Sequence, residues 1–168
     1  MDAVAGDEAV NDGTTLELPS DREILISRTF DAPARLVFEA LTKAEHVKRW
    51  WAPRSLGVTL VVCEIDFRVG GGYRYVMERD GATLPSFSGT FLEIDPPTRV
   101  VQTEVFEPYP DAGSTVTVML AESGGKTTMT SRSLYPSKEV RDMVLATGME
   151  KGMRESMRQL TELVASLR

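Results

Sequence analysis

The stretch that decides the fold spans residues 137–168 and reads SKEVRDMVLATGMEKGMRESMRQLTELVASLR. Its apolar residues recur at helical spacing and fall within one narrow arc of a helical projection. The members of this arc are Ala146, Met149, Met153, Met157, Leu160, Val164 and Leu167. Charged side chains, among them Lys151, Glu155 and Arg158, occupy the opposite face. The pattern predicts one long amphipathic helix with one face on a core and the other in water.

The composition of this predicted helix leaves its role open. Ser137 is a suitable N-cap and Glu139 lies in the first turn, where the helix dipole favours an anion. Methionine is flexible and fills irregular space, so the middle of the arc suits either an ordinary core or the wall of an adaptable apolar pocket. Gly148 and Gly152 each cost about 1 kcal/mol relative to Ala inside a helix. Such glycines indicate a closely packed neighbour, a local kink or space for a ligand.

Length and charge limit the classes of protein to consider. The 168 residues suit one domain with a core of its own. Five of the 25 acidic residues lie in the first twenty positions, so 20 acidic residues face 19 basic ones in the remainder. We therefore expect a disordered acidic leader over residues 1–20 and a nearly neutral folded domain over residues 21–168. A surface without a basic stripe is a poor match for nucleic acid.

The chain also lacks the signals of secretion and of membrane insertion. It has no basic stretch followed by an apolar run near its start, and no apolar segment of spanning length. Cys63 is the single cysteine, which excludes an internal disulfide. We expect a soluble cytoplasmic protein, either a monomer or a homodimer.

The order of predicted elements indicates an α+β fold. Residues 23–30 form a first strand, and two short helices follow between Pro33 and Trp51. The hydrophobic period then changes to two, and turn residues close each segment. The six later strands are predicted at residues 57–65, 73–79, 85–94, 99–106, 114–121 and 127–135. Sequential hairpins imply a curved antiparallel sheet of about seven strands that grips the final helix.

Several short motifs occur in an order that is typical of one family. They are FDAP at residues 30–33, VFEALT at 37–42, WWAP at 50–53, EIDFRVGG at 64–71, GTFLEI at 89–94 before a Pro-Pro pair, and TGMEKGM at 147–153. Together they resemble the AHSA-type family, the activators of the heat-shock-protein-ninety ATPase. This family belongs to the START-like (SRPBCC) superfamily, with the birch pollen allergen and the polyketide cyclases. The resemblance implies a helix-grip fold with an internal cavity between sheet and helix, but no single activity.

Polar clusters offer few candidates for chemistry. Glu64, Asp66 and Arg68 alternate along one strand, so their side chains share a face. They fit either salt bridges that stabilise the strand end or an acid–base group or ligand-binding group in the cavity. His46 is the only histidine and lies on a charged short helix. With one His and one Cys we expect neither a metal site nor a bound cofactor.

Aromatic and methionine side chains are the candidates for the cavity wall. Trp50 and Trp51 follow the second short helix, where the fold places the cavity mouth, and fit either an opening or one core ring with the other as a lid. The predicted lining residues are Phe38, Trp50, Trp51, Tyr73, Tyr75, Met77, Met149, Met153 and Met157. The inward face of residues 87–94 stays open, because Phe87 and Phe91 oppose Leu92 and Ile94.

Three functions follow from this pattern. The first is noncatalytic binding of a small hydrophobic or amphipathic ligand, lipid or polyketide-like, in the internal cavity. The second, implied only by the family resemblance, is stimulation of a heat-shock ATPase with a chaperone as partner. The third is a cyclase or hydrolase that uses Glu64, Asp66 and Arg68, or Tyr73 and Tyr75, as acid–base groups.

Overall fold

The computed structural model describes residues 12–168, and within them the strands form one nine-stranded antiparallel sheet. The strands lie in the order β1-β2-β9-β8-β7-β6-β4-β3, and the short β5 pairs with β4. Their bounds are β1 Thr14–Glu17, β2 Glu23–Phe30, β3 Val58–Ile65, β4 Gly72–Arg79, β5 Ala82–Thr83, β6 Phe87–Asp95, β7 Arg99–Phe106, β8 Ser114–Ser123 and β9 Lys126–Leu134. The seven predicted strands are all present.

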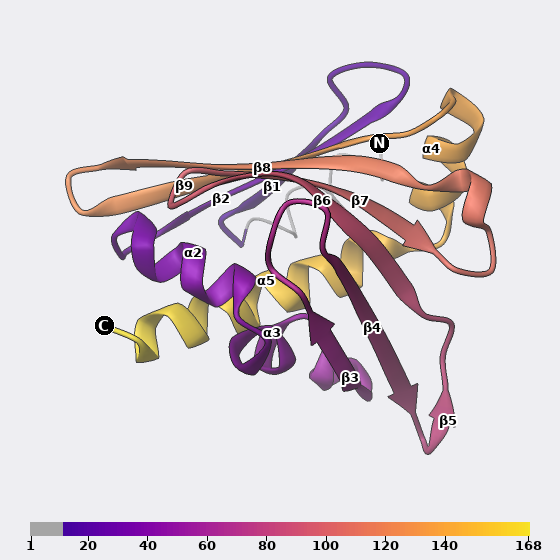
Figure 1. The fold of residues 1–168 in the computed structure, drawn as a ribbon, viewed down its shortest axis with the longest axis horizontal. Coiled ribbons are helices and arrows are strands. Elements are labelled where there is room, and N and C mark those ends of the chain that lie inside the picture. The colour runs from indigo at the N-terminus through magenta and orange to yellow at the C-terminus, as the bar shows by residue number, and fades with distance from the viewer. Residues whose placement is uncertain (1–11) are drawn as a thin grey trace, which may run out of the picture.

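Helices α2 Ala34–Thr42, α3 Ala44–Trp50 and α5 Met149–Ser166 cover one face of this sheet (Figure 1). Helix α4 Lys138–Ala146 lies at one end of the sheet (Figure 1), and two 3-10 turns form at Arg54–Leu56 and Pro110–Ala112. Figure 1 shows α5 and the α2–α3 pair on the same side of the sheet, while β3 and β4 bend down past α3. Leu160 and Val164 of α5 and Val37 of α2 are almost fully buried in the core between these layers. The predicted α+β helix-grip fold is confirmed.

The prediction of a disordered leader over residues 1–20 is wrong for Thr14–Glu17. Thr14–Glu17 form β1, which pairs with β2 so that Thr14 lies opposite Arg28. Arg28 donates hydrogen bonds to the Thr14 hydroxyl at 2.7 Å and to the Asp12 carbonyl at 3.0 Å. Arg154 on α5 forms an ion pair with the Asp12 carboxylate at 2.7 Å. These tertiary partners stabilise a segment whose own sequence has little to bury, and residues 1–11 lie outside the described part.

The predicted single helix over residues 137–168 is also wrong, because the chain forms two helices there. Gly148 adopts a left-handed φ of 78°, which favours glycine, and it separates α4 from α5. No atom lies within 4 Å of the Cβ position at Gly148, so its role is the break itself and not close packing. The predicted N-cap is confirmed, because the Val140 N–H donates to the Ser137 hydroxyl at 3.2 Å.

The loop after α3 is attached to α5 by one buried amide. Gln159 is only 2 % exposed, and its side-chain nitrogen donates to the Trp50 carbonyl at 3.0 Å and the Ala52 carbonyl at 2.7 Å. Its side-chain oxygen accepts from the Arg54 backbone N–H at 2.9 Å. A buried backbone group that loses its partner costs about 1–3 kcal/mol. Gln159 therefore fixes the loop between α3 and β3 on the long helix.

We predict that Gln159→Ala lowers the free energy of unfolding by about 2–4 kcal/mol, because three backbone groups lose their partner together. Urea titration followed by circular dichroism measures this change. Lys151→Ala is the control, since Lys151 is exposed on the same helix, and it should change stability by less than about 0.5 kcal/mol. Equal stability of the two variants would contradict the role assigned to Gln159.

Candidate functional site

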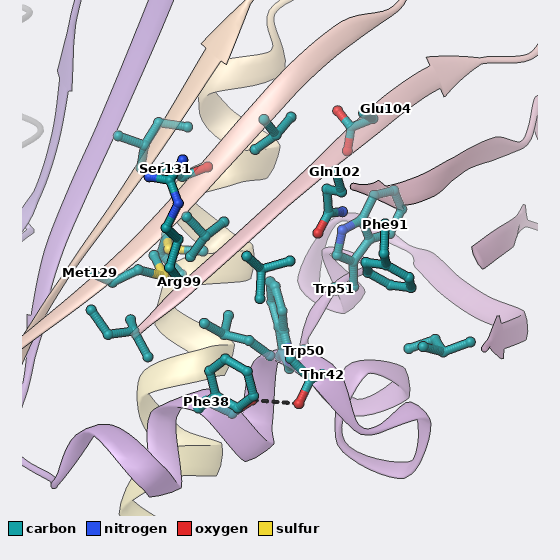
Figure 2. A pocket seen from close by; sticks show the side chains of 18 of the residues that line it. Phe38, Thr42, Trp50, Trp51, Phe91, Arg99, Gln102, Glu104, Met129 and Ser131 are labelled. Atoms are coloured by element: carbon teal, nitrogen blue, oxygen red, sulfur yellow. Dashed lines mark hydrogen bonds between the residues drawn. The ribbon is translucent and has the colours of Figure 1, made fainter. Parts of the chain in front are cut away.

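A partly enclosed cavity of about 150 Å³ lies between the concave face of the sheet and helices α2, α3 and α5. Figure 2 shows its lining side chains converging from these helices and from the long strands of the sheet. Inward-facing residues of the central strands form the floor, namely Val100, Val116, Val118, Leu120 and Met129. The cavity lies where the resemblance predicted it.

Aromatic rings form the wall on the helix side. Trp50 is buried, and its indole N–H donates to the Ala40 carbonyl at 2.8 Å, so it belongs to the core beside the cavity. Trp51 is half-buried, with its ring centroid 4.8 Å from that of Tyr75 and 5.2 Å from that of Phe87. Trp50 therefore joins α3 to α2, and Trp51 covers the cavity.

The far part of the cavity is polar. Gln102 and Glu104 follow Val100 on the inward face of β7. Ser131 also borders the cavity, but it lies two strands away on β9, opposite Val118. In Figure 2 Gln102 and Glu104 follow one another along one strand, with Trp51 and Phe91 near Gln102. A cavity with apolar walls and a few polar groups is typical of a small-molecule site.

Glu104 has an unusual environment for an acid. Its side chain borders the cavity and is half-buried. Burial raises the pKa of the Glu104 carboxyl above its ordinary value, since desolvation disfavours the charged form. Among the described residues, no side chain donates a hydrogen bond or an ion pair to this carboxyl. Glu104 is thus a half-buried acceptor without a partner among the described residues.

Three tyrosines near this polar end also remain uncharged. Burial, with a smaller effect of the nearby Glu104 charge, raises the pKa of Tyr135 to about 12. The same causes raise the pKa values of Tyr73 and Tyr75 further. The Tyr73 hydroxyl donates to the Thr103 carbonyl at 2.5 Å. These phenols act as neutral hydrogen-bonding groups and not as bases.

The structure divides the predicted lining residues into two groups. Phe38, Trp50, Trp51, Tyr75 and Met157 border the cavity. The other predicted lining residues, Tyr73, Met77, Met149 and Met153, are not in its wall.

The reasons for these four corrections are local. The Tyr73 ring packs over Gly89, where a Cβ would come within 2.5 Å of the ring. Met77 lies opposite Leu60, close to the β4–β5 turn. Met149 begins α5 at the helix break, and Met153 packs half-buried against the core beside the cavity.

Glu64, Asp66 and Arg68 are not cavity groups. Cys63 and Ile65 face inward on β3, so the strand alternation places Glu64 and Asp66 on the outer face, where both are exposed. Asp66 forms an exposed ion pair with Arg68 at 2.9 Å. Glu64 and Asp66 border a shallow open groove on this face. An enzyme reading that places these groups in the cavity is therefore wrong.

The polar end of the cavity was missed in the sequence. No inward face is predicted for the strand RVVQTEVF, and the structure turns Val100, Gln102 and Glu104 inward. The only indication in the sequence would have been that one of the two alternating faces of this strand is polar, although the strand lies beneath apolar helices.

The question left open for residues 87–94 has a structural answer in β6. Its pairing with β7 shifts register between Phe91 and Glu93. Phe91 faces inward, Leu92 is exposed, and Ile94 packs against the core again. A bulge thus explains why both phases of this strand look apolar.

Other chemistry has little support in the described residues. No group of three or more His, Cys, Asp or Glu side chains in residues 12–168 is arranged to hold a metal ion. Burial raises the pKa of the Cys63 thiol to about 11, so the reactive thiolate is scarce at neutral pH. Within the same residues, no helix is long and apolar enough to cross a membrane.

We predict a specific pH dependence of stability from Glu104. Because its folded pKa lies above the ordinary value of 4.5, the native state binds the proton more tightly than the unfolded state. Well below pH 4.5 the Glu104 carboxyl has no effect on the free energy of unfolding, because it is protonated in both states. As the pH rises from 4.5 through the folded pKa, the carboxyl lowers this free energy by up to about 1.4 kcal/mol per pH unit. Glu104→Gln should remove this decrease and be more stable than the wild type at neutral pH.

Glu107→Gln is the matched control for this measurement, which uses urea titrations between pH 4 and pH 8. Glu107 is an acid near the end of the same strand, and its ion pair with Arg74 lowers the pKa of its carboxyl. The contribution of Glu107 is lost as the pH falls, so this variant should keep the decrease above pH 4.5. A Glu104→Gln curve parallel to that of the wild type would show that the carboxyl is not desolvated.

Comparison with known proteins agrees with this architecture. A protein from Rhodobacter sphaeroides has 25% sequence identity and a TM-score of 0.83, with 91% of this chain and 99% of that chain covered. A protein from Staphylococcus epidermidis has 27% identity and a TM-score of 0.76, with coverages of 92% and 95%. A protein from Nitrosomonas europaea has 25% identity and a TM-score of 0.78, with coverages of 89% and 97%. No curated protein matches the chain.

The family match covers most of the sequence. The model described as "Activator of Hsp90 ATPase homolog 1-like protein" matches residues 31–165. These residues include the helix pair, the strands from β3 onward and nearly all of α5, and thus every part of the cavity wall except Ile26. With its helix-grip fold, the chain therefore belongs to the Activator of Hsp90 ATPase homolog 1-like family.

Proposed function

We propose that this protein binds a small hydrophobic or amphipathic molecule in the cavity between the sheet and α5, without converting it. The observation that carries this proposal is the combination of aromatic walls with an enclosed polar end where Glu104 lacks a partner. Apolar surface favours transfer of a ligand from water, and a few polar groups fix its orientation. Such a site suits a molecule with an apolar body and one polar head.

The cavity volume limits the size of that molecule. About 150 Å³ is enclosed here, and an apolar cavity of about this volume in another protein accepts benzene. A body of one ring, or a short branched chain, therefore fits the present space. A larger lipid or polyketide would have to displace Trp51, which is the half-buried ring over the cavity.

The proposal contains no chemical step because the enclosed ionisable groups favour their neutral forms. The raised pKa of Glu104 disfavours the carboxylate that a general base needs, and the raised pKa of Tyr75 keeps its phenol protonated. A neutral carboxyl and a neutral phenol are suited to hydrogen bonding with a ligand.

A substitution that fills the cavity tests this proposal. Val118 lies on the floor at the centre of β8, opposite Val100 and Ser131 on its neighbours. We predict that Val118→Phe abolishes binding of a one-ring probe such as toluene and leaves the free energy of unfolding within about 1 kcal/mol of the wild type, since the ring enters empty space. Both tryptophans border the cavity, so their fluorescence reports binding.

Val47→Phe provides the matched control, with the same change at a fully buried site of α3 that does not border the cavity. Overpacking there should lower the free energy of unfolding by about 1–3 kcal/mol. Saturable toluene binding in the wild type, lost in Val118→Phe, supports the proposal. A wild type that gives no saturable response, or a Val118→Phe variant as unstable as Val47→Phe, argues for a filled core.

A further inference from the structure

Glu104 borders the cavity, and no Lys, Arg or His among the described residues forms an ion pair with it. From β4, Tyr73 and Tyr75 face its surroundings, and Tyr135 approaches from the end of β9. All three are neutral phenols. Arg99 on the same strand also borders the cavity, but it forms an ion pair with Glu93 at 3.5 Å. Within residues 12–168 the Glu104 carboxyl therefore has no ion-pair partner, and a cationic ligand in the cavity would supply one.

We propose that the ligand of this cavity carries a protonated amine, and that Glu104 pairs with it as a carboxylate while the aromatic wall holds a one-ring or short-chain apolar body. This inference rests on the proposed function, and it names the chemical class of the ligand. Once the carboxyl is charged, it disfavours an anionic head through like-charge repulsion. A wholly apolar ligand would leave a buried acceptor without a partner.

The surroundings of Glu104 suit a cationic head group. An ammonium carries three N–H donors, and Gln102 and Glu104 offer acceptor oxygens at this end of the cavity. Gln102 is the next residue on the same face of β7, so its amide oxygen lies along the strand from the carboxyl. The rings of Trp51 and Tyr75 lie in the same wall and attract a cation through their electron-rich faces.

Pairing with an amine also links binding to pH. Burial favours the protonated form of Glu104 in the free protein, whereas a bound ammonium favours the carboxylate. Amine binding near and below the pKa of the free protein's Glu104 therefore releases a proton. The affinity for an amine should increase as the pH rises through that value, and then level off while the amine itself stays protonated.

The experiment compares four probes of one ring each, titrated into the full-length chain and its Glu104→Gln variant. They are benzylamine, benzyl alcohol, toluene and benzoate, which differ mainly in the head group. We expect benzylamine to bind most tightly and benzoate most weakly. Glu104→Gln should weaken benzylamine roughly tenfold to hundredfold and leave toluene unchanged. Calorimetry in two buffers of different ionisation enthalpy should show proton release for benzylamine only, and only in the wild type.

Each alternative result has a distinct meaning. If toluene binds but benzylamine binds no tighter than toluene or benzyl alcohol, the amine inference fails and the cavity proposal stands. If benzylamine binds equally well to Glu104→Gln, the carboxyl is not its partner and the inference fails. If none of the four probes binds the wild type, both the inference and the proposed function fail.

Discussion

The buried amide of Gln159 is the interaction on which the cavity depends. Its hydrogen bonds join the carbonyls of Trp50 and Ala52 and the N–H of Arg54 to α5. Ser156, one turn earlier, adds a hydrogen bond to the Trp51 carbonyl at 2.8 Å. The end of α3 and the loop after it, which carry Trp50 and Trp51, are thus attached by their backbone, and the Trp51 ring is left free to cover the cavity.

The cavity combines two properties that usually exclude each other. A concave sheet under apolar helices should carry apolar side chains on its inner face, and most of the cavity floor consists of such side chains. On β7 the inward phase instead carries Gln102 and Glu104. A buried carboxyl without a partner is costly, and such a cost is commonly retained where it serves a function. The same residue therefore connects the stability of the free protein to the chemistry of the ligand we propose.

Much of the fold could be predicted from local patterns. Alternation and turn residues located the seven long strands, and the chain order of the motifs indicated the helix-grip fold. Ser137 marked the start of the final helical region because its hydroxyl satisfies a nearby backbone N–H. Phe38, Trp50, Trp51, Tyr75 and Met157 were placed at the cavity because each lies on an element that the fold turns inward. In these cases a short stretch of chain carries the whole physical cause.

The sequence by itself determined the seven long strands, the helix pair, their order and the apolar face of α5, since hydrophobic periodicity and turn chemistry act over a few residues. Only the tertiary structure decided which phase of β7 faces inward, that the outer face of β3 carries Glu64 and Asp66, and that Thr14–Glu17 join the sheet. These features depend on partners far along the chain, such as Arg154 for Asp12 and Gln159 for Trp50. A carboxyl like Glu104 is exposed or buried according to what folds over it, and no local pattern contains that information.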